Sequence, residues 1–415
     1  MQRRDLLKAA GAGLLLPLGR SGWCATPAPG TRPGRRLVVV FLRGAVDGLS
    51  VVVPHAEEAY YRARPSIAIA RPGADGGALD LDGSFGLHPA LAPLLPLWQA
   101  GRLGFVQASG SPDGTRSHFD AQDYMESGTP GRKSTADGWL NRLLGTLPAQ
   151  APASPTRAVS IGAVLPRIWA GTQPVANIAA GAAAARPSLL DRPKVGDAFA
   201  RLYGGDDRLS RAYQESRQAH REVMSAMDAG ALEQEMTAAD NGAPLPNGFP
   251  EDAARLATLM RGEARVQLAF MALGGWDTHA NQGAATGQLA NRLAPLGQGL
   301  AVLARRLGPL LDDTVIVVMS EFGRTARQNG NGGTDHGHGN AMWLIGGGVA
   351  GGKVHGRWPG LEDAALNEGR DLAVTTDFRQ VLADVAQRHL QLDDKRLSAV
   401  FPGYAPQDAP RVMRG

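Results

Sequence analysis

The chain is poor in cysteine, with Cys24 as the only one among 415 residues. Cys24 lies within a predicted export signal, so removal of that signal would leave a mature chain without a thiol. This excludes a disulfide framework, thiolate zinc sites and iron–sulfur clusters. Any metal ion in the mature protein is therefore expected to bind Asp, Glu, His, hydroxyl or backbone oxygen ligands.

Concentrated positive charge and long apolar runs are also scarce. The formal net charge is +4, aromatic residues make up 6% of the chain, and no basic stripe with interleaved aromatics is present. Nucleic acid is therefore not an expected partner. Beyond the amino terminus, no apolar run approaches the about 20 residues that a membrane helix needs, so the mature chain is predicted to have no membrane span.

The amino terminus resembles a twin-arginine export signal. Arg3 and Arg4 precede a short apolar stretch rich in Gly and Ala, from Ala9 to Gly19, and an Ala/Pro-rich segment follows. We interpret residues 1–28 as a signal peptide that is cleaved between Cys24 and Ala28. The predicted location of the mature protein is the periplasm or the extracellular space.

Strand-like and helix-like segments alternate along the rest of the chain, which predicts an α/β fold. The predicted strands are Leu37–Leu42, Leu103–Ala108, Ala158–Ile161, Val266–Leu273, Thr314–Met319 and Ala341–Ile345. The predicted helices are His88–Ala100, His118–Ser127, Trp139–Leu144, Asp252–Met260, Leu289–Leu311 and Asp377–His389. We expect one domain over residues 35–405, with a helical insertion near residues 195–262. Continuous apolar strands such as LVVVFL favour a mostly parallel sheet that is buried on both faces.

Two short Gly-rich segments combine acidic residues with histidines. TDHGHGN contains Asp335, His336 and His338, and GGWDTH contains Asp277 and His279. Imidazole and carboxylate groups held by a flexible backbone suit zinc or manganese, and magnesium or calcium is an alternative. These five residues are predicted metal ligands of a site with one or two ions.

Other reactive residues follow predicted strands, where parallel sheets bind ligands. They are Asp47, Ser117, His118, Glu321 and Arg324. Two interpretations of Ser117 stay open, a nucleophile or the N-cap of the helix that follows. Arg324 is either a clamp for a substrate oxyanion or the partner of Glu321, and Glu321 is either a metal ligand or a group that orients a histidine.

The motifs RGAVDGLS, RSHFDAQDYMESG, GGWDTHANQ and SEFGRTARQNGNGGTDHGHGN together resemble the family called domain of unknown function 1501. The resemblance extends from about Arg36 to Pro402. That family is similar in fold to the alkaline phosphatase and sulfatase superfamily, whose members use one or two divalent metals to cleave phosphate or sulfate esters. The resemblance implies a three-layer α/β sandwich and an exported metal-dependent hydrolase of this kind.

The resemblance also implies roles for individual residues. Asp47 matches the acidic ligand after the first strand, and Ser117 matches the Ser or Thr nucleophile. Asp335 and His336 resemble an adjacent ligand pair, with Asp277 and His279 as the other Asp and His, and either His338 or His355 as the last histidine. The expected substrate is a small anionic ester or a cell-envelope molecule. Two other classes stay open: a noncatalytic metal-containing protein that binds an anionic ligand or an envelope partner, and a redox enzyme.

Overall fold

The computed structural model of the chain describes residues 34–133, 135–149, 154, 156–180, 237–262, 265–405 and 409–414. Residues 35–415 form one unit by their mutual contacts, and only this unit is considered below. The predicted signal peptide, residues 1–28, and most of the predicted insertion near 195–262 lie outside the described residues. Among the described residues, none of the helices has both the length and the apolar composition that a membrane span requires.

The predicted mostly parallel sheet is confirmed, and β1 (Arg36–Leu42) runs through its middle. β1 pairs in parallel with β8 (Leu268–Leu273) on one side and with β9 (Thr314–Ser320) on the other. In the order β11-β5-β10-β9-β1-β8-β6-β7, the other strands are β5 (Leu103–Gly110), β6 (Ala158–Ile161), β7 (Ala176–Ile178), β10 (Asn340–Gly346) and β11 (Val354–His355), and β12 (Thr376–Asp377) pairs with β5. β10 runs antiparallel to both of its neighbours. Apolar side chains on both faces of β1 explain why it lies inside the sheet.

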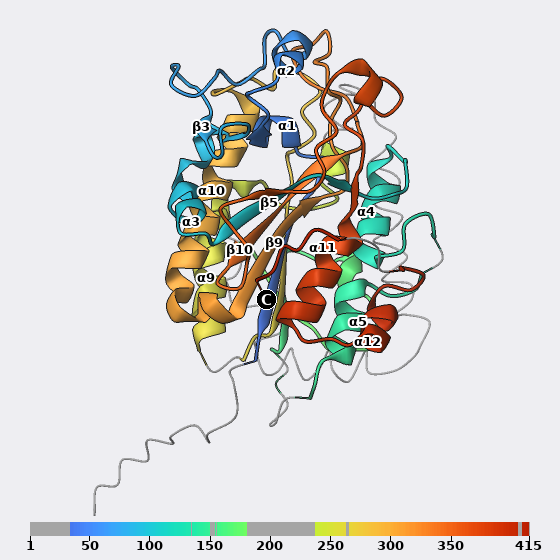
Figure 1. The fold of residues 1–415 in the computed structure, drawn as a ribbon. Helices are drawn as coiled ribbons and strands as arrows, with labels where there is room; N and C mark the ends of the chain where they lie inside the picture. The colour runs from blue at the N-terminus through green and yellow to red at the C-terminus, as the bar shows by residue number, and fades with distance from the viewer. Residues whose placement is uncertain are drawn as a thin grey trace, which may run out of the picture. The chain divides into compact units, whose positions relative to one another are not determined.

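Helices cover both faces of the sheet, which gives three layers (Figure 1). On one face, Val38 and Val40 of β1 pack in a core with Leu300 and other residues of α3 (Leu95–Gln99), α9 (Phe249–Arg261) and α10 (Gln288–Leu307). On the other face, Val39 and Phe41 pack with α4 (His118–Ser127), α5 (Trp139–Thr146), α11 (Phe378–Asp384) and α12 (Asp394–Val400). Successive residues of a strand point to opposite faces, so one apolar run serves both cores.

Proline and glycine divide two of the predicted helices. The predicted helix His88–Ala100 is a 3-10 helix η1 (Pro89–Leu94) followed by α3, because Pro93 and Pro96 have no N–H to donate within a continuous helix. The predicted helix Leu289–Leu311 ends at Leu307, where Gly308 takes a φ of 55°, and a 3-10 helix η6 (Gly308–Asp313) follows. The predicted helix Asp377–His389 is α11 followed by a π turn, η8 (Val385–His389).

Shorter elements lie near the carboxyl ends of the strands and between the main helices. A second sheet contains β2 (Val52–Val53), β3 (Leu79–Asp80) and β4 (Gly86–Leu87). The remaining helices are α1 (Gly48–Val51), α2 (Glu58–Ala63), η2 (Arg167–Trp169), η5 (Pro246–Gly248) and η7 (Asp363–Ala365). The polar residues considered next come from the loops that follow β8 and β9 and from the start of α4.

Candidate metal centre

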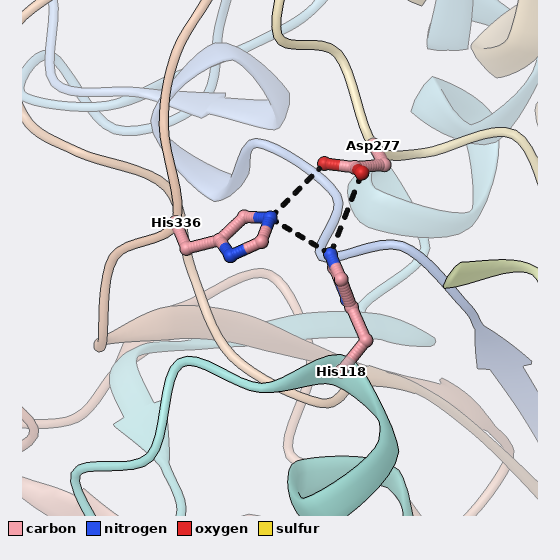
Figure 2. A group of neighbouring side chains, drawn as sticks. All are labelled: His118, Asp277 and His336. Carbon is pink, nitrogen blue, oxygen red and sulfur yellow. Dashed lines mark hydrogen bonds and ion pairs between the residues drawn. The ribbon is translucent and has the colours of Figure 1, made fainter. Parts of the chain in front are cut away.

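Two loops and one helix end bring reactive side chains together at the carboxyl edge of the sheet. Asp277 and His279 follow β8, His336 lies between β9 and β10, and His118 is the first residue of α4. α4 begins there because the hydroxyl of Ser117 caps the backbone N–H of Asp120, and it ends at Gly128, which adopts the left-handed conformation. Figure 2 shows His118, Asp277 and His336 pointing toward one another.

The Nε2 atoms of three histidines converge on one carboxylate. His336 Nε2 lies 2.9 Å from His118 Nε2 and 2.9 Å from His279 Nε2. Asp277 Oδ1 lies 3.1 Å from His279 Nε2 and 3.4 Å from His336 Nε2, and Asp277 Oδ2 lies 3.5 Å from His118 Nε2. Ligand atoms of a tetrahedral zinc site, at about 2.0 to 2.1 Å from the ion, lie about 3.3 Å from one another. The observed separations scatter around that value.

The Nδ1 atom of each imidazole donates a hydrogen bond to an oxygen. The three hydrogen bonds run from His118 Nδ1 to Glu321 Oε1 at 2.8 Å, from His279 Nδ1 to Asp335 Oδ1 at 3.1 Å, and from His336 Nδ1 to the carbonyl of Arg116 at 2.9 Å. A neutral imidazole that donates through Nδ1 has its lone pair on Nε2. When neutral, all three rings are thus held in the tautomer that a metal ligand requires, with a second group behind each of them.

The Asp277 carboxylate supplies a fourth ligand atom. Its side chain is fully buried, and Oδ2 has no hydrogen-bond partner in the described part of the chain. Its other oxygen, Oδ1, accepts a hydrogen bond of 2.6 Å from Arg324 Nη1, which fixes the plane of the group. A buried carboxylate oxygen without a donor is costly unless a cation binds it. His118, Asp277 and His336 each offer one atom, and these atoms lie within 4.8 Å of one another. His279 Nε2 lies beside His336 and Asp277, so the group fits a divalent cation with His279 as a fourth candidate ligand.

Charges within the group are strongly coupled. Burial disfavours the ionised form of Asp277, but its close contacts with the three histidines and the charge of Arg324 outweigh burial and hold the pKa of Asp277 far below its usual range. Burial likewise disfavours the imidazolium of His118, yet the bonds to Asp277 and Glu321 raise the pKa of His118 to about 9. Without a metal, the centre thus retains a proton on His118. A cation that binds here displaces that proton, so its affinity depends on pH.

One side of the group is open to solvent. The side chains of His118 and Asp277 are 6% and 0% exposed, whereas those of His279 and His336 are 13% and 16% exposed. The imidazoles of His279 and His336 thus lie nearer the surface than His118 and Asp277. An accessible position next to buried ligands is typical of catalytic metal sites.

Arg324 and Glu321 support the ligands from behind. The guanidinium of Arg324 is almost fully buried and binds Asp277 through Nη1, the Thr334 hydroxyl through Nε at 3.2 Å, and the Thr334 carbonyl through Nη2. Glu321 accepts hydrogen bonds from His118, from Gly44 N at 2.8 Å and from Gln122 Nε2 at 3.0 Å. The partners of Arg324 are thus Asp277 and Thr334, and neither expected role of Arg324, clamp or partner of Glu321, matches this arrangement.

The structure places the expected ligand Asp47 in a buried ion pair. Arg64 binds both carboxylate oxygens, at 2.5 and 3.0 Å, and Ser50 and Gln282 each donate to Oδ2 at 2.7 Å. Burial opposes ionisation of Asp47, but the charge of Arg64 and these bonds hold its pKa below the usual range. Since neighbouring donors already satisfy both oxygens, Asp47 has no free position for a metal.

The structure also keeps Ser117 and two of the expected histidines apart from the centre. Ser117 is exposed, and its hydroxyl accepts the bond from Asp120 N that caps α4, which agrees with the second of its two interpretations. His338 donates through Nε2 to the carbonyl of Ser111 at 3.0 Å, and the Nε2 atom of His355 lies 2.8 Å from the carbonyl of Ala350. These backbone bonds point the two imidazoles at other parts of the fold.

Sequence reasoning missed His118 as a ligand. The pattern that identified the helix also marked His118 as its first residue, and it follows a strand in the same way as Asp277. The neighbouring Ser117 hydroxyl matched the nucleophile expected at this position, and His118 was given no ligand role. A histidine in the first turn of a helix, beside two other His-containing loops, was the available signal.

Solved structures similar to this chain include a protein in the alkaline phosphatase superfamily from Vibrio parahaemolyticus. It is 10% identical, with a TM-score of 0.37, and the match covers 78% of this chain and 63% of that one. The C-terminal periplasmic domain of EcEptC from Escherichia coli is also 10% identical, with a TM-score of 0.39 and coverage of 91% and 89%. The lipoteichoic acid synthase LtaP from Listeria monocytogenes is 9% identical, with a TM-score of 0.34 and coverage of 87% and 73%. Such likenesses concern the fold alone.

Comparison of sequences gives a more specific result. No curated protein sequence matches this chain. A family model described as "Protein of unknown function (DUF1501)" matches residues 34–401, which include all four ligand residues and the groups behind them. The chain belongs to the DUF1501 family.

Proposed function

We propose that this protein is an exported hydrolase of phosphate or sulfate esters that binds one divalent metal ion through His118, Asp277, His279 and His336. One observation supports the metal above all others. Each of the three histidines donates through Nδ1 to an oxygen, so that the Nε2 atoms of all three are turned toward the Asp277 carboxylate, whose Oδ2 has no hydrogen-bond partner in the described chain. Packing alone does not account for that arrangement, because the arrangement brings several hydrogen-bond acceptors together without a donor between them.

The donor atoms favour zinc or manganese. Three imidazole nitrogens with one carboxylate oxygen suit these ions, whereas magnesium and calcium prefer oxygen ligands alone. A bound cation would supply Lewis acidity, which polarises an ester oxygen and makes a coordinated water more acidic. The four candidate ligands form one cluster, which favours one ion over two.

The residues of the chain keep this centre in place. Glu321, Asp335 and the Arg116 carbonyl hold the protons on the outer nitrogens of the three imidazoles, and Arg324 holds Asp277. The opening beside His279 and His336 would admit the ester together with a water molecule. Because the Ser117 hydroxyl is exposed and serves as a helix cap, we favour water over Ser117 as the nucleophile.

The substrate class and the export route come from the sequence. The ester class follows from the motif resemblance described above, and the route from the pair Arg3 and Arg4 ahead of a short apolar stretch. Twin-arginine substrates cross the membrane folded, which suits a protein that acquires its metal before export. We propose the periplasm or the extracellular space as the place of action, with a small anionic ester or a cell-envelope molecule as substrate.

A noncatalytic metal protein is the second candidate. The donors of Arg324 are bound to Asp277 and Thr334, and the Ser117 hydroxyl lies outside the centre. The two residues that were expected to clamp and attack a substrate are therefore committed to other contacts. This observation favours a role in which the metal binds an anionic ligand or an envelope partner without turnover.

Metal analysis combined with turnover assays tests both candidates. The purified full chain is analysed for bound metal and assayed on aryl phosphate mono- and diesters and on aryl sulfates, with added zinc or manganese. We expect His336→Ala to lose both metal and turnover, and the matched variants His338→Ala and Ser117→Ala to keep both. Metal without turnover on any ester would establish the second candidate, and a chain that binds no divalent metal would exclude both.

A further inference from the structure

One buried amide, the side chain of Gln282, joins the loops that follow β1, β8 and β9. Its Oε1 atom accepts hydrogen bonds from the hydroxyl of Thr278 at 2.8 Å and from that of Thr334 at 2.9 Å. Its Nε2 atom donates to Asp47 Oδ2 at 2.7 Å and to Ser50 Oγ at 3.4 Å. All four hydrogen-bonding positions of the amide are therefore occupied, and each of the four partners is itself buried.

Two of these contacts reach residues that are next to the candidate ligands in the chain. Thr278 lies between Asp277 and His279, and Thr334 lies two residues before His336. Both hydroxyls donate to the same amide oxygen. This oxygen therefore holds together the two loops that carry three of the four candidate ligands.

Charged groups on both sides fix the orientation of the amide. A guanidinium can only donate, so the bond of 3.2 Å from Arg324 Nε to Thr334 Oγ1 leaves the hydroxyl proton of Thr334 for Gln282 Oε1. An ionised carboxylate can only accept, so Asp47 requires the Nε2 atom of Gln282 on its side. One chain of hydrogen bonds thus links the Asp47 carboxylate to Arg324, the residue that holds Asp277.

We propose that Gln282 is a positioning residue of the metal centre, anchored on Asp47, and that it raises the affinity for the divalent cation by fixing the ligand loops. This role rests on the metal site proposed above. Ligands that are held in place before the ion arrives lose less conformational freedom when it binds. Asp47 is suited to be the anchor because Arg64 binds both of its oxygens. The residue expected as a metal ligand thus acts through Gln282 instead.

The variant Gln282→Met keeps the length of the side chain but removes the amide. A backbone bond of 3.1 Å from Thr334 N to Thr278 O still joins the two loops, so we expect the variant to fold. Competition with a chromophoric chelator for zinc should give a dissociation constant about 10 to 100 times that of the wild type. The matched variant Gln107→Met removes another buried amide, which donates to the Val52 carbonyl at 2.8 Å, and should bind zinc as the wild type does.

Two substitutions of Thr334 separate positioning from packing. Thr334→Val keeps the shape of the buried side chain but removes the hydroxyl that joins Gln282 to Arg324, and it should weaken zinc binding about tenfold. Thr334→Ser keeps the hydroxyl but loses a buried methyl group. It should therefore unfold at a lower temperature than the wild type and still bind zinc with the wild-type affinity.

The outcomes distinguish the role of Gln282 from the metal site itself. A wild type that binds zinc, together with Thr334→Val and Thr334→Ser proteins of equal affinity, would overturn the positioning role and leave the metal site in place. A loss in Gln107→Met as large as that in Gln282→Met would do the same. A wild type that binds no zinc or other divalent metal would overturn both. The two Thr334 variants decide the matter even if Gln282→Met does not fold.

Discussion

The substitution Glu321→Gln changes the group behind one ligand without altering its shape. Glu321 Oε1 accepts from His118 Nδ1 at 2.8 Å, from Gly44 N at 2.8 Å and from Gln122 Nε2 at 3.0 Å. A glutamine can still accept these bonds through its amide oxygen, but it has no charge. A hydrogen bond to a charged acceptor contributes about 1.4 kcal/mol more than one to a neutral acceptor, so we expect metal affinity to fall about tenfold.

Competition with a chromophoric chelator at fixed pH measures this affinity directly. The control Glu362→Gln removes a charge from an exposed ion pair with Arg62 and should bind metal as the wild type does. Thermal unfolding of the metal-free proteins shows whether Glu321→Gln is folded. A folded Glu321→Gln protein with a dissociation constant within twofold of the wild type would refute the view that Glu321 tunes His118.

Two further predictions concern stability. Burial lowers the pKa of both His88 and His389 to about 4, so the unfolded chain takes up protons between pH 6.5 and 4 that the folded protein does not, and each histidine should cost about 3 kcal/mol of unfolding free energy as the pH falls through that window. Denaturant titrations at several pH values should show that the unfolding free energy of the double variant His88→Asn/His389→Gln falls less between pH 6.5 and 4 than that of the wild type. An equal fall in both proteins would contradict this account. In a second experiment at pH 7, Arg64→Met leaves the buried carboxylate of Asp47 unpaired and should cost about 3 to 5 kcal/mol, whereas Arg62→Met in an exposed pair should cost less than about 1 kcal/mol. Equal losses for Arg64→Met and Arg62→Met would show that burial of the pair is unimportant.

The positions of most strands and helices could be predicted from the sequence, because the periodicity of hydrophobic residues reflects which faces of an element are buried. The predicted helix His118–Ser127 and strand Ala158–Ile161 match α4 and β6 residue for residue. Less predictable were the ends of helices that contain proline. Pro93 and Pro96 interrupt an apolar pattern without changing its period, so the pattern alone gives one long helix.

At the candidate site, the sequence indicated which loops meet but could not indicate which side chains turn inward. Asp277, His279 and His336 lie together, as expected of residues that follow β8 and β9, the strands on either side of β1. Asp47 also follows a strand, yet Arg64, which comes from the end of α2, takes both of its oxygens. Such a contact depends on how a distant segment packs, and neither spacing nor composition records it.

The distances along the chain between the ligands have a consequence for biosynthesis. His118 and His336 are 218 residues apart, and His279 and His336 are 57 apart. A ribosome that has released only the first two-thirds of the polypeptide has therefore not yet exposed the last imidazole. Since long-range contacts of this kind form late, we expect the proposed metal site to form only after the central sheet has assembled, so that metal uptake would report the completion of folding.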